Sequence, residues 1–167
     1  DPLHIYMGNP LLHNSHSHTT TYNYHRMWLR KQIVLGFTAS YNKDINPQAT
    51  LYSYNSATGV YTSKPMNVKG GDMWKFAFNY DHGIGFYFRL MNKFALETAK
   101  SYGFLTIVDN NAADAQPELN KQKRLGINND FEFSYETEKL QLTLFDRLES
   151  NRYRYDDASY NTTPLFN

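Results

Sequence analysis

Hydrophobic and polar residues alternate one by one along two neighbouring stretches in the middle of the chain, which is typical of β-strands with one apolar face. Every second residue from Trp74 to Tyr80 is aromatic, and every second residue from Ile84 to Leu90 is apolar. Asp81-His82-Gly83 lies between them and predicts a three-residue hairpin turn with glycine in the left-handed conformation. With that turn, Tyr80 pairs with Ile84 and both apolar rows fall on one face.

The same period recurs on both sides of this hairpin. It predicts strands over about 18–28, from 33 to about 42, over 124–135, and from 140 onward. Thr50–Tyr54 is a candidate continuation of the second strand beyond a break at Asp44–Pro47, because proline cannot donate to a strand ladder. The fold predicted is therefore an all-β, antiparallel meander of about six long strands.

The connections between these strands differ in length at the two ends. Short turns are predicted near Arg30, His82 and Thr137, whereas mostly longer connections are predicted near Ala57, over Thr98–Asn120, and in the tail. Long strands with tight turns at one end and longer loops at the other are typical of an outer-membrane β-barrel. The residues predicted to face lipid are Trp74, Phe76, Phe78, Tyr80, Ile84, Phe86, Phe88 and Leu90. The polar row that includes Asn128, Asp130 and Glu132 suits a wet lumen.

Composition removes several classes of function. Lys and Arg number 17 against 16 Asp and Glu, so the net charge of +1 offers no general field for nucleic acid. Cysteine is absent, which removes disulfides, thiolate metal sites and cysteine nucleophiles. No segment has the ~20 apolar residues of a membrane helix, but a transmembrane strand needs only ~10 residues of weaker alternation.

Short motifs resemble a known family. Ile5–Leu12 contains Gly8-Asn9-Pro10-Leu11-Leu12, which is similar to the G-N-P-x-L segment before a barrel strand in TonB-dependent outer-membrane receptors and the related outer membrane protein beta-barrel family. The succession Leu35–Asp44, Thr58–Tyr61 and Pro65–Gly71 before Trp74 resembles the strand-loop-strand succession of those barrels. His13 departs from the family, which often has Lys or Pro there, and Asn167 follows Phe166 where a final strand would end on Phe.

The resemblance implies that the chain is the later part of a receptor barrel in the bacterial outer membrane, without its plug domain and final strands. We expect an extended segment over 1–17, the barrel portion over 18–155 and a polar tail over 156–167. The implied function is uptake of a nutrient such as an iron chelate, a glycan or a peptide. The implied partners are outer-membrane lipid and a TonB-type energising protein that contacts other parts of the receptor.

Candidate chemistry on individual side chains is sparse. His16 and His18 would share one face of a strand and are weak candidates for binding zinc, copper or nickel, but spacing supplies no third ligand. A polar, histidine-rich turn is the favoured interpretation. Asp156-Asp157 is interpreted as a calcium-binding or solvated pair rather than as a catalytic pair of carboxylates. No nucleophile motif is present, so we predict no enzyme activity and no cofactor.

Tyrosines near one end of the predicted strands are candidates for a ligand surface on which a sugar or peptide could stack. They are Tyr52, Tyr54, Tyr61, Tyr153 and Tyr155. Packing at strand ends or at a membrane interface is the alternative for the same side chains.

Two other functional classes stay open at this stage. The first alternative is a soluble all-β binding or adhesion module, in which the row containing Trp74 is a core and the row containing Asn128 faces water. The second is an outer-membrane hydrolase. Because a barrel fragment has two unpaired edge strands, we expect the isolated chain to close on itself, fold into two layers, or dimerise edge to edge.

Overall fold

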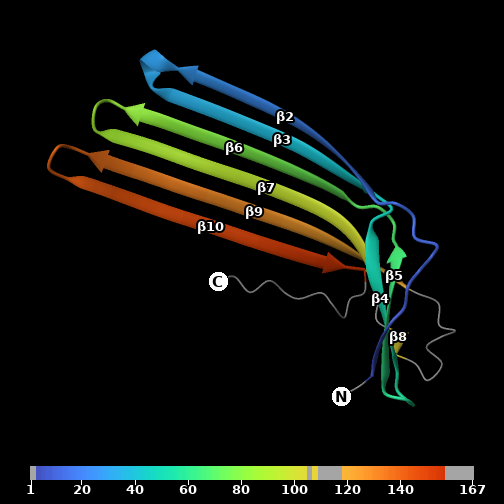
Figure 1. Ribbon diagram of the computed structural model, residues 1–167. Coiled ribbons are helices and arrows are strands. Elements are labelled where there is room, and N and C mark those ends of the chain that lie inside the picture. Colours follow the sequence, from blue (N-terminus) through green and yellow to red (C-terminus); the bar gives the residue numbers. More distant parts are fainter. Residues whose placement is uncertain (1–2, 105–106, 109–117, 157–167) are drawn as a thin grey trace.

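The computed structural model describes residues 3–104, 107–108 and 118–156, which form two β-sheets (Figure 1). The large sheet has the order β10-β9-β7-β6-β3-β2, and every neighbouring pair in it is antiparallel. Its strands are β2 (His16–Trp28), β3 (Ile33–Ile45), β6 (Asp72–Ile84), β7 (Phe88–Phe104), β9 (Leu119–Glu136) and β10 (Gln141–Tyr155). The prediction of an all-β fold with six long antiparallel strands is confirmed.

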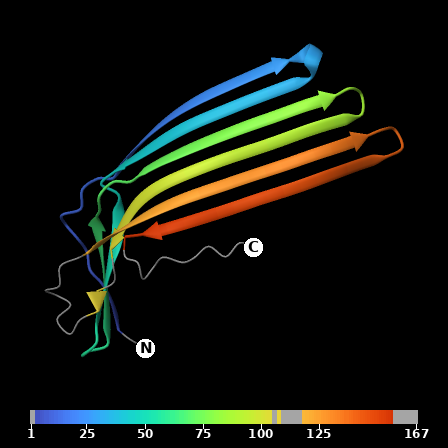
Figure 2. The ribbon, with the colours of Figure 1, turned by 180° about the vertical axis from the view of Figure 1, so that it is seen from behind.

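The small sheet lies at one end of the large sheet, opposite the hairpin tips (Figures 1 and 2). Its order is β1-β5-β4-β8, with β4 antiparallel to β5 and parallel pairing at both edges. Its strands are β1 (His4–Tyr6), β4 (Gln48–Asn55), β5 (Val60–Asn67) and β8 (Ile107–Val108). The candidate continuation of the second long strand through Thr50–Tyr54 is wrong, because the chain turns at Asn46 (φ 50°) and Pro47 and then pairs with β5.

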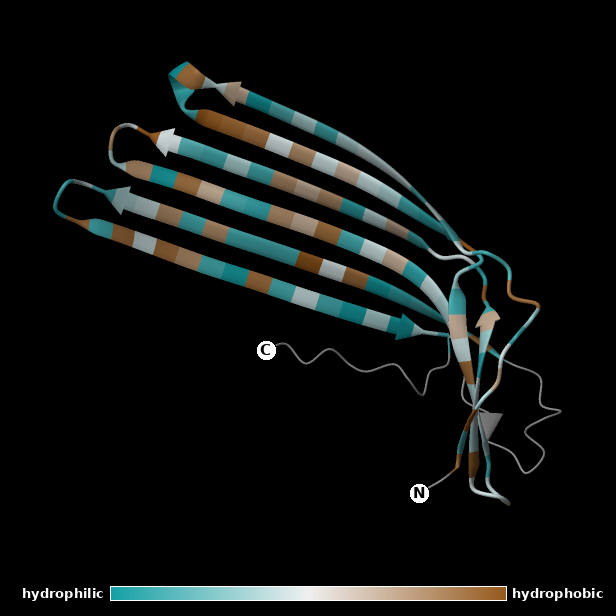
Figure 3. Cartoon of the chain, in the orientation of Figure 1, coloured by the Kyte–Doolittle hydropathy of each residue, from teal (hydrophilic) through white to brown (hydrophobic). Residues whose placement is uncertain are grey.

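Cross-strand register gives the large sheet two chemically different faces. One row, for example, runs through Tyr24, Phe37, Phe78, Phe94, Asn129 and Leu148. The neighbouring row on the other face runs through Asn23, Thr38, Ala77, Ala95, Asn128 and Glu149. Figure 3 shows this alternation as brown and teal bands along β7, β9 and β10. We call the face that carries the row from Tyr24 to Leu148 the apolar face, and the face that carries the row from Asn23 to Glu149 the polar face.

The central hairpin turn lies four residues beyond its predicted place. Ile84 pairs with Phe88, and Gly85 takes the left-handed conformation at φ 66° in the turn Gly85–Tyr87. Gly83 instead stays in β6, where its N–H donates to the carbonyl oxygen of Gln32 at 2.9 Å. Continuing β6 therefore lets it pair with β3 as far as Ile33, the first residue of β3, and this overrides the local signal of Asp81-His82-Gly83.

Moving the turn by an even number of residues leaves the side-chain faces unchanged. The predicted lipid-facing residues of β6 and β7 do lie on one face, with Trp74 opposite Thr98 and Ile84 opposite Phe88. Two assignments are corrected: Phe86 lies in the turn rather than in a strand, and His82 lies in β6 opposite Leu90 rather than in the turn.

The polar connection predicted from Thr98 to Asn120 is largely strand at both of its ends. β7 continues to Phe104, and β9 begins at Leu119, with each residue of 98–104 paired to one of 119–125. The backbone hydrogen bonds between two strands do not depend on which side chains the strands carry. Polar strand segments can therefore pair without any hydrophobic pattern in the sequence. Residues 109–117 and 157–167, which include Asp157 and most of the predicted polar tail, lie outside the described residues.

The large sheet is open, and no other described residues form a layer over either of its faces. Among the described residues, Val68 alone is a buried hydrophobic residue, and it lies in the connection between the two sheets. β2 and β10 are the edge strands, so the sheet forms neither the closed barrel nor the two layers expected of an isolated chain. The described residues thus contain no hydrophobic core that buries the apolar face.

Candidate functional site

The apolar face is broad, and its aromatic side chains contact one another across strands. The rings of Tyr41 and Trp74 are 4.5 Å apart, and those of Phe88 and Tyr135 are 4.9 Å apart. The face continues onto β10, where Leu144 is 64% exposed. A contiguous exposed apolar surface of this kind is typical of a surface that contacts an apolar partner.

The length of the apolar face matches the thickness of a membrane. On β6 the face runs from Trp74 to Ile84, which at about 3.3 Å per residue is roughly 33 Å along the strand. A strand tilted by about 40° would cover roughly 25 Å of membrane with this stretch, which is the height of the apolar band in outer-membrane barrels.

The three hairpin tips are staggered in one direction across the sheet (Figure 1). The β2–β3 ladder ends at Trp28 and Ile33, whose row continues through His82. β6 and β7 extend two residues beyond that row, and β9 and β10 extend to Glu136 and Gln141. A progressive stagger of this kind is what tilted strands need if their turns are to lie at one level.

Polar groups on the opposite face are paired with one another across strands. Glu97 accepts from Lys75 at 3.1 Å and from Arg124 at 3.2 Å, which links β6, β7 and β9. Arg147 on β10 donates to Asp130 on β9 at 2.8 Å, and Arg89 donates to Asp81 at 2.9 Å. These pairs satisfy charges on a face that the sequence predicted to be wet.

A shallow groove of about 280 Å³ lies on the polar face beside the pairs made by Glu97. Small residues leave this space: Ala77 and Ala95 are direct partners, and Gly126 lies opposite Glu97. Sequence reasoning missed the groove and its ion pairs, because they depend on the register between β6, β7 and β9. The signal in the sequence was the opposite charges of Lys75 and Glu97, which lie at paired positions of two adjacent strands.

Replacing Glu97 by Gln tests whether the polar face is in contact with water. A water-exposed ion pair contributes only about 0–1 kcal/mol, so Glu97→Gln is expected to lower stability by at most about 1 kcal/mol, and added salt should shrink the difference. The measurement is urea unfolding at low and high salt. A loss of about 3 kcal/mol or more that salt does not change would instead indicate that Lys75 and Arg124 are buried away from water.

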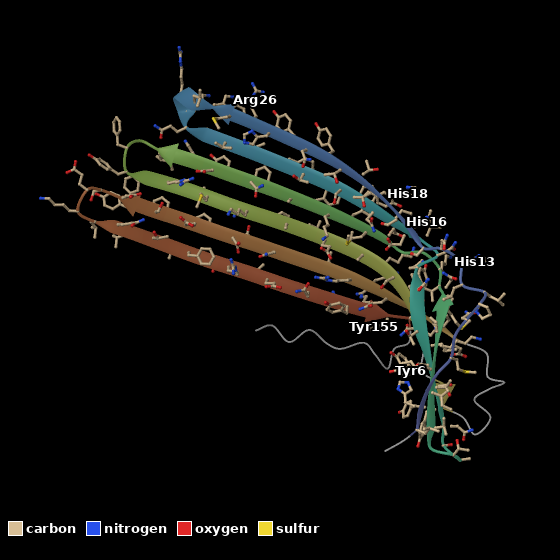
Figure 4. The ribbon with its side chains drawn as sticks, viewed as in Figure 1. Tyr6, His13, His16, His18, Arg26 and Tyr155 are labelled. Carbon is tan, nitrogen blue, oxygen red and sulfur yellow. The ribbon has the colours of Figure 1, made fainter. Side chains whose placement is uncertain are left out.

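The predicted ligand-surface tyrosines divide between the two sheets. Tyr54 and Tyr61 are direct partners with rings 4.6 Å apart, and Tyr52 shares their face of the small sheet. Tyr6 on β1 joins this face, because it lies beside Ser63, the partner of Tyr52. Figure 4 shows Tyr6 on the small sheet, and Tyr155 at the end of β10.

Tyr153 and Tyr155 lie on the polar face of the large sheet, not with the small-sheet tyrosines. The Tyr155 hydroxyl accepts from Gln122 Nε2 at 3.1 Å, and the Arg124 guanidinium lies 5.9 Å from the ring centre of Tyr153. The five tyrosines therefore form two separate groups, of which the one on the small sheet gains Tyr6.

The histidines do not assemble into a metal site. His16 and His18 share one face of β2, as predicted, and both are exposed (Figure 4). His13 lies outside β2, and its backbone N–H donates to Asn67 Oδ1 at 2.7 Å. Within residues 3–104, 107–108 and 118–156, no three His, Asp or Glu side chains gather closely enough to hold a metal ion.

Comparisons with known proteins leave the chain without an assigned relative. No helix in the described part of the chain is long and apolar enough to cross a membrane. The sequence and the fold were compared with protein-family models, curated proteins and solved structures, and none of the three comparisons found a match.

Proposed function

We propose that the large sheet is part of the wall of a β-barrel in a bacterial outer membrane, with its apolar face toward lipid and its polar face toward the lumen. The observation that carries this proposal is the apolar face itself, which spans six strands and is covered by no other described residue. Lipid is the partner that accepts such a face without specific side-chain contacts, and antiparallel strands satisfy their own backbone hydrogen bonds.

The open edges support the same proposal. Among the described strands, β2 and β10 each pair with a neighbour on one side. A sheet that spans lipid must close, because an unpaired N–H or C=O in hydrocarbon costs several kcal/mol. Six strands are fewer than the eight of the smallest bacterial barrels, so further strands are needed to complete the wall. These strands come from other parts of a longer chain or from a second copy.

The barrel proposed here is a receptor for nutrient uptake, driven by a TonB-type partner that contacts other parts of the receptor. The small sheet supports a receptor role, because it projects beyond the large sheet at the end away from the tight turns (Figure 2). It presents Tyr6, Tyr52, Tyr54 and Tyr61 on one face, where a glycan or peptide would stack. The resemblance of Gly8–Leu12 to receptor barrels points the same way.

Single tryptophans at two neighbouring positions on opposite faces test the membrane assignment. Phe78→Trp and Asn79→Trp, each made in a Trp28→Phe/Trp74→Phe background, place one indole on the apolar and one on the polar face. In phosphatidylcholine vesicles, brominated acyl chains should quench the indole of the Phe78→Trp variant strongly and that of the Asn79→Trp variant weakly. Water-soluble acrylamide should show the reverse order.

The leading rival is a soluble binding module, and the same pair of variants separates the two functions. A soluble module would be monodisperse in plain buffer, and neither indole would be quenched by brominated lipid. That result would refute the membrane wall. The rival also lacks a second layer over the apolar face in the described residues, and a soluble sandwich requires one.

A further inference from the structure

One cross-strand row on the apolar face consists entirely of ionisable residues. It crosses all six strands at the end near the small sheet, and each member is the direct partner of the next. Its members are His18, Lys43, Asp72, Lys100, Lys123 and Arg154. We call these residues the basic row, since four cations in it face one acid.

The basic row borders the apolar face directly. One row further in lie Tyr41 and Trp74, whose rings are 4.5 Å apart, together with Leu125. At the opposite end of the same face, the row containing Trp28, Ile33, Leu90 and Phe133 has no Asp, Glu, Lys or Arg. One row in from that end, Arg26 and Asp146 carry opposite charges, whereas Arg152 adds a cation one row in from the basic row. The net positive charge of the apolar face is therefore concentrated at the end near the small sheet.

Among the described residues, Asp72 is the one acid in this row, so it cannot balance all four cations. Lys100, Lys123 and Arg154 stand directly opposite one another on β7, β9 and β10. Lys100 has Asp72 beside it at 3.8 Å, whereas Lys123 lies between two cations and is exposed. Like charges directly opposite in a sheet destabilise it, so an external anion in this place would stabilise the fold.

We propose that the basic row binds the phosphate groups of anionic lipid at one membrane boundary. The proposal rests on the membrane wall proposed above, because only lipid brings phosphate to the edge of an apolar surface. Neighbouring strands are about 4.8 Å apart, so side chains from two strands can reach one phosphate. Long Lys and Arg side chains also extend from an apolar surface toward headgroups while their methylenes stay in contact with it.

Lipid selectivity tests this inference. The full chain is placed in phosphatidylcholine vesicles that contain traces of spin-labelled phosphatidylglycerol or spin-labelled phosphatidylcholine. We expect phosphatidylglycerol to associate with the protein about five-fold more strongly, with a preference that salt weakens. Lys100→Gln/Lys123→Gln/Arg154→Gln should abolish the preference, and the single variant Lys123→Gln should reduce it at least about two-fold.

A matched variant removes the same charge at the other end of the molecule. Arg30→Gln/Lys31→Gln/Lys139→Gln changes three exposed cations in the tight turns and should keep the full preference. Equal association of both lipids with the wild-type chain would overturn the inference. An equal loss of the preference for phosphatidylglycerol in the two triple variants would also overturn it. Quenching of the Phe78→Trp variant by brominated phosphatidylcholine is independent of headgroup charge, so its failure would refute the membrane wall and not only the basic row.

Discussion

With the large sheet as the barrel wall proposed above, Phe37→Arg is expected to lower the stability of the protein in vesicles by about 2–4 kcal/mol, the cost of an arginine on the lipid face near the middle of a barrel strand. Phe37 lies on the apolar face of β3, between its partners Tyr24 on β2 and Phe78 on β6. A guanidinium in that position loses its water and finds no acid in its own row, which continues through Phe94, Asn129 and Leu148.

Thr38→Arg is the control for this prediction, because it puts the same side chain on the next residue and on the opposite face. Thr38 lies between Asn23 and Ala77, and its hydroxyl donates to Asn23 Oδ1 at 2.9 Å, a role that a guanidinium can also fill. We expect a cost below about 1 kcal/mol there. Both variants are measured by urea unfolding from vesicles. Equal costs at the two positions would mean that the two faces have the same surroundings.

The alternation of side chains is sufficient to predict the two faces of the large sheet without its register. Trp74, Phe76 and Phe78 share a face in any strand, since the side-chain period is two, and an even shift of the hairpin preserves the match with β7. The turn itself was not predictable from Asp81-His82-Gly83, because its place depends on the pairing of β6 with β3 and on the contact of Gly83 with Gln32.

Features that depend on partners distant in sequence were not predicted. The basic row needs the register of all six strands, and Lys43 and Arg154 are far apart in the chain. The small sheet likewise needs β1 to find β5 across more than fifty residues, with no hydrophobic period to mark it. Local pattern therefore predicts strands and faces, whereas pairing decides which polar side chains meet.

The two sheets also depend on a close approach of backbones that requires glycine. Gly70 and Gly71 connect β5 of the small sheet with β6 of the large sheet. A Cβ atom added to Gly70 would lie 1.8 Å from the carbonyl oxygen of Asp44, and one added to Gly71 would lie 2.1 Å from that of Lys100. The Gly71 carbonyl also accepts from the Asp44 N–H at 3.1 Å. At these two glycines the connection thus passes so close to the backbones of β3 and β7 that only a hydrogen atom fits in place of a side chain.

Gly71→Ala is therefore expected to destabilise the protein by about 3 kcal/mol, near the upper end of what overpacking costs, because the atom in the way belongs to the backbone and cannot rotate aside. Gly103→Ala in β7 is the control: a Cβ there meets no atom within 4 Å, so the change should be neutral or slightly stabilising. In a Trp28→Phe background, urea unfolding followed by Trp74 fluorescence reports on the strand that begins immediately after Gly71. If the two variants unfold at the same urea concentration, the connection before β6 does not pass close to the backbones of Asp44 and Lys100. The close approach that places the small sheet beside the basic row would then be contradicted.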